Sequence, residues 1–553
     1  MNPRPAQTRF AGLALTALAV LVACAHPPAA PPPGPAVDLS PVAPQPKPSG
    51  LATDWHLGAF MEIFVRAYQD SDGDGIGDLR GLTSRLDYLK ELGVTGLWLM
   101  PVTASADRDH GYATTDFRAI EPDYGTLEDF DELLRQAHAR GIGVIIDYVV
   151  NHSAHKHPLF QAALANPAHP QRDWYVWSEE APQGWDIWGK NPWYWAAAQP
   201  WEWQGELKDL PKPPPGAKGH YFGTFGPHMP DFNLRKPEVM NWHLSNLRFW
   251  LNRGLDGFRL DAVPHLVENN AKDWNDQPES RRLTKRLFDA ISAHPGRYTV
   301  CEATAEPQAY SRPEVCGSAF AFGLERAILA AVNGKTEAVA EVGRFFQTRP
   351  HRMATMLANH DIFAGARIWD QLRGDEARYK LAAASYLLQP GIPFIYYGEE
   401  IGLAGVTHLP GDASIRSPMS WDASANAGFT RAAKPFRASA PNAASHHAAA
   451  QRADQNSLFH HYRGLLQLRQ QQRALRSGSY EGVQADGPVL SYLRRSGGET
   501  LLVALNYSAL PQVLNRPERD ARALRLWPQL APSLPAGVLP AWGAQVWLLD
   551  PSE

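Results

Sequence analysis

Charged residues within an apolar stretch are the first chemical signal in this chain. In GLDGFRLDAVPH (254–265) the apolar side chains predict a buried strand, yet Arg259 and Asp261 stand two positions apart within it. Side chains two positions apart in a strand share one face, so the two charges must lie together. A guanidinium next to a carboxylate favours the ionised carboxylate through charge and hydrogen bonding. The pair is therefore a candidate for a reactive group in a buried place.

Further acidic and histidine side chains stand at the ends of other predicted strands. Glu302 follows the run YTVC, Asp361 closes LANHD, and His152 and His360 occupy corresponding positions. In a barrel of parallel strands, catalytic side chains gather where the strands end. One acidic residue at such an end is commonly a helix cap or part of a solvated loop. Three carboxylates converging on one mouth predict catalysis instead.

The elements that must position these residues predict a (β/α)8 barrel. From residue 55, short β-branched runs alternate with amphipathic helical stretches, which is typical of parallel βα units. Helices are expected at 79–92 and Pro237–Arg253, the second with a proline at its start and Gly254 just past its end. Eight strands of this kind predict a TIM barrel. The expected strands are 61–66, 94–99, 143–150, 256–261, 298–302, 319–322, 353–358 and 392–397.

Two segments depart from this βα alternation. Residues 153–236 follow the third strand and are far too long for an ordinary βα loop, so we expect an inserted subdomain there. After an expected helix at 457–473, short strands and turns predict a separate antiparallel β-sandwich at 477–553. The barrel would then comprise residues 51–152 and 237–476.

Ordered motifs resemble one enzyme family. DYVVNH (147–152), GFRLDAVPH (257–265), CEAT (301–304) and LANHD (357–361) look like the four signature regions of the α-amylase superfamily, glycoside hydrolase family 13. MPDFN (229–233) resembles its fifth region, and GIPFIYYGEE (391–400) its late barrel motif. The resemblance runs from about residue 55 to the end of the chain. It implies a retaining enzyme that acts on α-glucosidic bonds.

The resemblance assigns roles to the strand-end residues. Retention needs an ionised carboxylate that attacks the anomeric carbon and a protonated carboxyl group, about 5–5.5 Å away, that releases the leaving oxygen. By resemblance Asp261 is the nucleophile, kept ionised by Arg259, and Glu302 is the acid/base. Asp361 would grip sugar hydroxyls and stabilise the positively charged transition state. The implied sugar-binding residues are His152 and His360, and in DRDHGYATTDF (107–117) Tyr112 as a stacking platform and Asp109 as a hydroxyl ligand.

Eight tryptophans in the inserted segment fit the same interpretation. Indole faces pack well on the apolar faces of glucose rings. Each single tryptophan is more simply explained as part of the subdomain core, but the group predicts a carbohydrate-lined cleft. The eight are Trp174, Trp177, Trp185, Trp188, Trp193, Trp195, Trp201 and Trp203.

A structural calcium site is predicted in DSDGDGIGD (70–78). Its acidic residues alternate, with Gly75 at the sharp turn, as in an EF-hand loop, but Gly81 stands where that motif has its bidentate Glu. The loop instead resembles a calcium site of several family members. The alternative is a solvated acidic turn. The expected ligands are Asp70, Asp72, Asp74, the carbonyl of Ile76, and Asp78.

The N-terminus predicts export. Arg4 and Arg9 precede an apolar run, 10–23, that is too short to span a membrane, which is typical of a secretory signal. The following Leu-Val-Ala-Cys resembles a bacterial lipobox and predicts a lipoprotein signal over 1–24 with lipidation of Cys24; a plain signal peptide is the alternative. Residues 25–50, rich in Pro and Ala, are expected to form a semi-rigid tether. The mature protein would thus be anchored in the bacterial envelope, periplasmic or outer-membrane.

Composition excludes one class of partner. A net charge of −4 and a pI near 6.6 provide no basic field for a phosphate backbone, so nucleic acid is not expected to bind. We expect a monomer whose partner is an α-glucan or maltooligosaccharide, with the membrane reached through the lipid anchor alone. Cys301 and Cys316 could pair outside the cytoplasm or remain as two buried thiols.

The choice among family members stays open at the level of sequence. MPDFN resembles enzymes intermediate between the oligo-1,6-glucosidase and neopullulanase groups, which include exported α-amylases. RSPMSWDASANAGF (416–429) and RDWYVWS (172–178) resemble α-glucosidases and trehalose synthases instead. Because an exported enzyme meets starch-like oligosaccharides, we expect an α-amylase-like hydrolase of α-1,4-glucans. The alternatives are an α-glucosidase, a trehalose synthase, or an inactive sugar-binding relative.

Overall fold

The computed structural model describes residues 37–107, 109–198, 212–515, 523–528 and 537–549. The predicted signal peptide with Cys24, and also Trp201 and Trp203, lie outside the described residues. Within the described ranges, no helix combines the length and the apolar composition needed to cross a bilayer.

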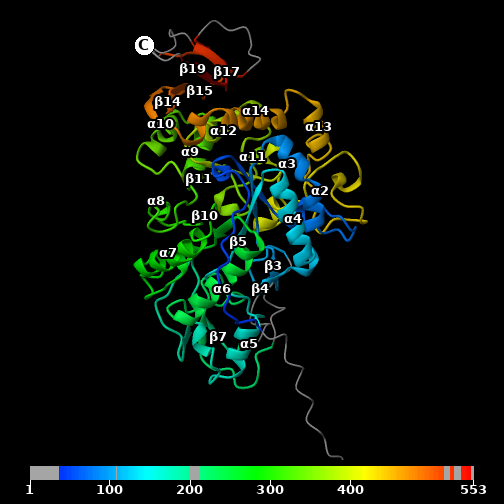
Figure 1. Cartoon of the computed structure of the whole chain (residues 1–553), viewed down its shortest axis with the longest axis vertical. Helices are drawn as coiled ribbons and strands as arrows, with labels where there is room; N and C mark the ends of the chain where they lie inside the picture. The colour runs from blue at the N-terminus through cyan, green and yellow to red at the C-terminus, as the bar shows by residue number, and fades with distance from the viewer. Residues whose placement is uncertain (1–36, 108, 199–211, 516–522, 529–536, 550–553) are drawn as a thin grey trace, which may run out of the picture. The chain divides into compact units, whose positions relative to one another are not determined.

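A parallel β-barrel with helices around it forms the first part of the fold (Figure 1). Seven strands make one sheet in the order β10-β9-β5-β2-β1-β12-β11. Isolated parallel bridges from Cys301 to Ala319 and from Phe320 to Ala354 join the two edge strands, so the predicted eighth strand is present as bridging residues. The predicted fold class is confirmed. The strands are β1 Phe60–Ile63, β2 Gly96–Leu99, β5 Gly143–Tyr148, β9 Gly257–Leu260, β10 Tyr298–Cys301, β11 Ala354–Thr355 and β12 Ile392–Tyr396.

Inside the barrel, an aromatic layer supports a polar one. Phe60 stacks on Phe394 with ring centroids 4.5 Å apart, and Trp98 packs against Phe320. A Cβ on Gly96 would lie 2.5 Å from the Phe60 ring, so this strand position requires glycine. Two residues beyond Phe60, the alternation of the strand turns Glu62 to the same face as this ring. The charged side chain of Glu62 thus lies above the aromatic layer, on the same face of the strand.

Helices cover the outside of the barrel. The expected helix at Pro237–Arg253 is present as α6 with Gly254 in the left-handed conformation. The expected helix at 79–92 is divided at Arg85, where Thr83 and Ser84 donate to backbone carbonyls of their own turn and so favour a break. The helices include α2 Leu79–Ser84, α3 Leu86–Leu92, α4 Leu127–Ala139, α7 Pro278–Ser292, α9 Leu324–Val332, α10 Thr336–Arg344, α12 Glu376–Leu387 and α14 Leu458–Gln471.

The long segment after β5 folds into a small unit of its own. It contains α5 Pro158–Ala165 and a three-stranded sheet in the order β6-β8-β7, namely Trp177–Ser178, His220–Phe222 and Trp193–Trp195. A bridge between His152 and Asp231 ties the start of the segment to its end. The insertion is therefore fastened beside the end of β5, where the predicted site residues lie.

The C-terminal residues form an antiparallel sheet in the order β13-β14-β15-β19-β17. One face of this sheet, with Tyr492 and Val503, joins the hydrophobic core of the barrel helices, while the other, with Leu493 and Leu502, packs on Leu514, which follows a strand of a two-stranded sheet. The central strands are thus covered on both faces. The strands are β13 Glu481–Asp486, β14 Val489–Ser496, β15 Glu499–Asn506, β17 Ala523–Trp527 and β19 Ala544–Leu549, with β16 Gln512–Val513 and β18 Val538–Leu539 as the smaller pair.

The described part of the predicted tether has no helix or strand but contacts the barrel. The Arg118 guanidinium donates to Asp38 over 2.7 Å, and the backbone N–H of Gln45 donates to the side chain of Asn252 on α6 over 2.8 Å. These polar contacts hold residues 38–45 against the barrel.

Cys301 and Cys316 form a disulfide, which settles the alternative left open by the sequence. Both residues are fully buried. Cys301 ends β10 immediately before Glu302. The bond therefore fastens the segment after Glu302 to the end of its own strand.

We predict that removing this disulfide lowers the free energy of unfolding. Closing a loop of 15 residues stabilises by about 3 kcal/mol in the chain-entropy model. A Cys301→Ala/Cys316→Ala variant should lose stability of this order in urea unfolding, and dithiothreitol should destabilise the parent but not the variant. Equal sensitivity of both proteins to the reductant would contradict the prediction.

Candidate active site

Arg259 is the centre of the candidate site. Its side chain is 1% exposed, and its Nη1 lies 2.5 Å from Oδ1 of Asp261 and 2.8 Å from Oδ1 of Asp147. Its Nη2 lies 2.9 Å from Oε2 of Glu302. The register of β5 with β9 pairs Asp147 with Arg259, which brings their side chains together. Three carboxylates, from three neighbouring strands, thus contact the one buried guanidinium of Arg259.

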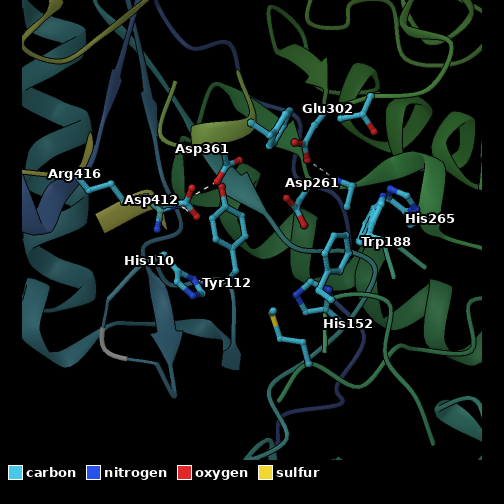
Figure 2. A pocket seen from close by; sticks show the side chains of 15 residues that line it. His110, Tyr112, His152, Trp188, Asp261, His265, Glu302, Asp361, Asp412 and Arg416 are labelled. Carbon is cyan, nitrogen blue, oxygen red and sulfur yellow. Dashed lines mark hydrogen bonds and ion pairs between the residues drawn. The ribbon is translucent and has the colours of Figure 1, made fainter. Parts of the chain in front are cut away.

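The two predicted catalytic carboxylates face one space. Asp261 and Glu302 bind the two terminal nitrogens of one planar guanidinium, so the bound oxygens lie within about 8 Å of each other. Oε2 of Glu302 also accepts the backbone N–H of Ala262 over 3.1 Å. Figure 2 shows both side chains on the wall of the same pocket. The arrangement can present a nucleophile and a proton donor to one sugar.

The electrostatics of this cluster differ from a simple ion pair. Burial raises the pKa of Asp147 to about 6, although the charge of Arg259 opposes the shift. Burial likewise raises the pKa of Asp261 above its ordinary value, again opposed by Arg259. The prediction that Arg259 keeps Asp261 ionised is therefore incomplete, because this one cation is divided among three carboxylates. The cluster favours holding a shared proton, which a nucleophile and an acid in one site require.

A second ion network surrounds Asp361. Nε2 of His360 lies 3.2 Å from its Oδ2, and Arg416 lies 3.0 Å from its Oδ1. Nδ1 of His360 is 2.5 Å from Oε1 of Glu62 on β1. Burial alone would lower the pKa of His360, but Asp361 and Glu62 raise it to about 10. Although burial acts to raise the pKa of Asp361, His360 and Arg416 hold it well below its ordinary value, so this carboxylate is charged.

Tyr112 connects the two networks. Its hydroxyl donates to Oδ2 of Asp147 over 2.9 Å and contacts Nε2 of His360 at 2.6 Å. Its ring lies nearly parallel to the imidazole of His360, with centroids 5.6 Å apart. The hydroxyl is thereby fixed, and the ring lines the cavity.

A cavity of about 610 Å³ opens over these side chains. His152 lines it and is 2% exposed. Burial lowers the pKa of His152 to about 3, although a hydrogen bond with the backbone of Tyr112 opposes the shift, so the ring is neutral. A neutral imidazole at the cavity wall can donate to or accept from sugar hydroxyls. Of the predicted substrate residues, Asp109 is not among those lining the cavity; its carboxylate contacts Arg437 at 2.8 Å.

The described tryptophans divide between core and cavity. Trp177 stacks on Phe160, and Trp185 and Trp193 pack edgewise against Phe222. Trp188 instead lines the cavity and is 62% exposed. Most of the described tryptophans thus build the subdomain, and one faces the site.

The comparisons with known proteins agree with this geometry. The family model for the α-amylase catalytic domain matches residues 62–478. The chain belongs to the α-amylase family. The matched range begins at Glu62 and includes all the carboxylates described above.

Relatives within the α-amylase family carry several activities in their names. The chain is 34% identical over 482 residues to α-amylase 3 of Dictyoglomus thermophilum, covering 84% of this chain and 88% of that protein. It is also 34% identical over 519 residues to the trehalose synthase/amylase of Mycolicibacterium smegmatis, covering 83% and 85%. Among solved structures, a mutant trehalulose synthase in complex with Tris matches with a TM-score of 0.76 and 26% identity, covering 90% of this chain and all of that one. The protein is thus a family 13 glycosidase by descent and fold.

Several site residues of this α-amylase family member were not assigned from the sequence. Asp147 in GVIIDY and Glu62 in FMEI are charged residues within buried strands, the same signal that singled out Arg259. A charged residue within an apolar strand therefore predicts Asp147 and Glu62 as site residues as well. Arg416, Phe363 and His265 also line the cavity but stand outside the strands, where the sequence offers no comparable signal.

The acidic loop brings together three of its predicted calcium ligands. Carboxylate oxygens of Asp70, Asp72 and Asp78 lie within 4.8 Å of one another. Asp74 is not part of this group; its Oδ1 accepts the backbone N–H of Ile76 over 2.7 Å. Burial and the negative charges of Asp72 and Asp70 raise the pKa of Asp74. Carboxylate oxygens such as those of Asp70, Asp72 and Asp78 are the ligands that calcium prefers.

We predict that Glu62→Gln makes the charge of His360 sensitive to pH. Without the Glu62 carboxylate, the imidazolium loses one of two stabilising anions and should deprotonate below the parent value of about 10. The pKa of His360 is higher in the folded protein than in the unfolded chain, so the protonated imidazole stabilises the folded state. This stabilisation is complete below the unfolded-state pKa of 6.5 and is lost as the pH rises toward 10. Denaturant unfolding should therefore show the advantage of the parent over the variant shrinking across this window.

An NMR titration of His360 gives an independent measurement, with His446, which pairs with Glu376 instead of Glu62, as an internal reference. A His360 signal that titrates identically in parent and variant would refute the proposed role of Glu62.

Proposed function

We propose that the protein is a retaining glycosidase that cleaves α-1,4-glucosidic bonds of starch-derived glucans and maltooligosaccharides through a covalent glucosyl-enzyme. The observation that carries the proposal is the placement of Asp261 and Glu302 on the two nitrogens of buried Arg259, at the wall of one cavity. Retaining and inverting glycosidases both need two carboxyl groups of different protonation on one sugar. The match to the α-amylase family supports retention rather than inversion.

In the first step, a carboxylate oxygen of Asp261 forms a bond to the anomeric carbon while the bond from that carbon to the leaving oxygen breaks. Glu302 transfers its proton to that oxygen, and the leaving sugar departs with a new hydroxyl. In the second step, a water molecule attacks the anomeric carbon, its proton passes to Glu302, and Asp261 is released. Both protonation changes thus occur on one residue.

The charge distribution suits the transition state of these steps. The sugar becomes positively charged as the glycosidic bond breaks. The ionised Asp361 lines the cavity opposite Glu302, fixed by His360 and Arg416 (Figure 2). A carboxylate already held in place stabilises developing positive charge without further reorganisation.

A second candidate is a trehalose synthase or α-glucosidase. It is favoured by the relative named as a trehalose synthase/amylase, which is as similar in identity as the α-amylase. Chemically, isomerisation requires that the cleaved sugar stay in the site and attack the glucosyl-enzyme in place of water. Products from maltose and maltoheptaose therefore decide between the candidates. A ladder of intermediate lengths means internal cleavage, glucose alone means a glucosidase, and a new disaccharide from maltose means isomerisation.

We predict that Asp261→Asn and Glu302→Gln each abolish most activity on maltoheptaose. Loss of the acid/base removes a contribution of about 10²- to 10⁴-fold, and loss of the nucleophile removes the covalent route. Chromatography of early products and NMR of their anomeric configuration provide the measurements. Asp289→Asn, on the exposed surface of α7, is the matched control and should retain parent activity. Parent-like hydrolysis by either site variant would overturn the assignment, and inactivity of the parent would favour a binding protein.

We further propose that Asp70, Asp72 and Asp78 hold a structural calcium ion. Asp70 and Asp78 are buried and also fix the loop, since Oδ1 of Asp78 accepts the N–H of Gly81 at the start of α2. Asp72 is exposed and completes the group. The ion would hold the turn between β1 and α2, with the chemistry left to the carboxylates in the barrel.

We predict that millimolar calcium raises the melting temperature of the parent, because a ligand that binds the folded state alone stabilises it. Asp72→Asn should abolish the calcium-dependent increase while leaving the calcium-free melting temperature nearly unchanged, since this side chain is exposed. Asp412→Asn, at the active-site cavity, should retain the full increase. No calcium effect on the chelator-treated parent would contradict the site.

The N-terminal residues support a proposal on location. We propose that the protein is exported and anchored through lipidated Cys24, and that it acts as a monomer. Labelling of expressed protein with a fatty-acid analogue, with Cys24→Ser as the comparison, tests the anchor.

A further inference from the structure

We propose that Trp188 is the platform on which the sugar ring of the leaving group, or of an acceptor, stacks during the reaction. This inference rests on the proposed function and specifies it, because it assigns a sugar-selective subsite to one side chain of the inserted subdomain. The evidence comes from the backbone, the exposure and the neighbours of this residue.

Trp188 is held at the tip of a tight turn in an unfavourable backbone conformation. Ile187 and Lys190 exchange both backbone hydrogen bonds, so the loop between them consists of Trp188 and Gly189. Both residues have positive φ, 51° at Trp188 and 82° at Gly189. Such turns favour Gly, Asn or Asp, and a bulky side chain at positive φ is an outlier that requires a reason. A tryptophan at this position therefore lowers the stability of the turn, which indicates that its indole has a role.

Its side chain is exposed, but it is supported from behind. The ring of Trp188 stands nearly perpendicular to those of His265 and Trp274, with centroids 5.5 and 5.6 Å away. His265 and Trp274 in turn stack on each other at 5.5 Å. A third ring, that of Phe225, lies 5.7 Å from the indole and is tilted by 40° to it. The indole is thus braced by three rings while 62% of the residue remains exposed. A rigid aromatic surface open to a cavity is what the apolar face of a sugar binds.

A polar partner lies next to this surface. His265 lines the cavity, is 4% exposed, and has no hydrogen-bond partner on Nδ1. Burial lowers the pKa of His265 to about 4, so the ring is neutral and can donate or accept. An aromatic face with an unpaired polar atom beside it matches the mixed apolar and hydroxyl character of a sugar ring.

The position relative to the acid/base identifies which sugar would bind. Figure 2 shows Trp188 and His265 on the side of the pocket that carries Asp261 and Glu302, across from Asp361 and Arg416. In the proposed mechanism Glu302 gives its proton to the leaving oxygen, so the departing group extends toward this side. Trp188 would bind that group, while Tyr112 and Asp361 hold the glucosyl unit that reacts.

The experiment compares a leaving group that has a sugar ring with one that has none. For Trp188→Ala we expect kcat/KM on maltose and maltotriose to fall roughly five- to tenfold, mainly through KM. α-Glucosyl fluoride releases only fluoride, so its hydrolysis should change by less than about twofold. Trp188→Phe should recover part of the loss because it restores an aromatic face. Trp195→Ala is the matched control, since Trp195 is 51% exposed in the same subdomain and does not line the cavity.

The outcomes separate this inference from the proposed function. An equal loss on all substrates, or no loss on maltose, would overturn the assignment of Trp188. A parent enzyme that hydrolyses neither maltose nor α-glucosyl fluoride would instead overturn the proposed function. Melting temperatures of the four proteins exclude misfolding as the cause, because Trp188→Ala should unfold close to the parent temperature.

Discussion

The burial of the Arg259 charge inside the barrel is the constraint on which the site depends. A lone cation in an aromatic interior is strongly unfavourable, so carboxylates must surround it. Asp147, Asp261 and Glu302 meet this requirement from three adjacent strands. Because they outnumber the cation, the cluster holds more negative charge than it can neutralise. That imbalance allows a proton to remain in the site and lets the site stabilise a positively charged sugar.

The surrounding structure keeps this cluster in place. An aromatic layer lies below it, and Tyr112 links it to the His360–Asp361 network. Glu62 keeps His360 charged, so that Asp361 remains an anion near the reacting sugar. The inserted subdomain contributes Trp188 to the wall of the same cavity. The barrel thus carries the charged side chains, and the insertion adds an aromatic surface beside them.

The fold and the convergence of the candidate carboxylates could be predicted, because strand alternation fixes which side chains share a face. The placement of Arg259, Asp261 and Glu302 at one cavity follows from that rule and from the ordered motifs. The sharing of one guanidinium among three carboxylates could not be predicted, since it depends on the register of β5 with β9. The pairing of Asp109 with Arg437 joins residues more than three hundred positions apart, which sequence spacing does not reveal. The contact of Asp38 with Arg118 likewise joins residues far apart in the sequence, and it holds part of the expected linker against the barrel.

The most direct measurement of the central claim is mass spectrometry of the enzyme after reaction with α-glucosyl fluoride. Glu302→Gln should form the glucosyl-enzyme, because fluoride needs no proton to leave, but should hydrolyse it slowly for lack of a base. The account predicts a mass increase of one glucosyl residue, located by peptide mapping at Asp261 and absent from Asp261→Asn. A stable adduct on any other residue, or turnover of the fluoride with inversion of the anomeric configuration, would contradict it.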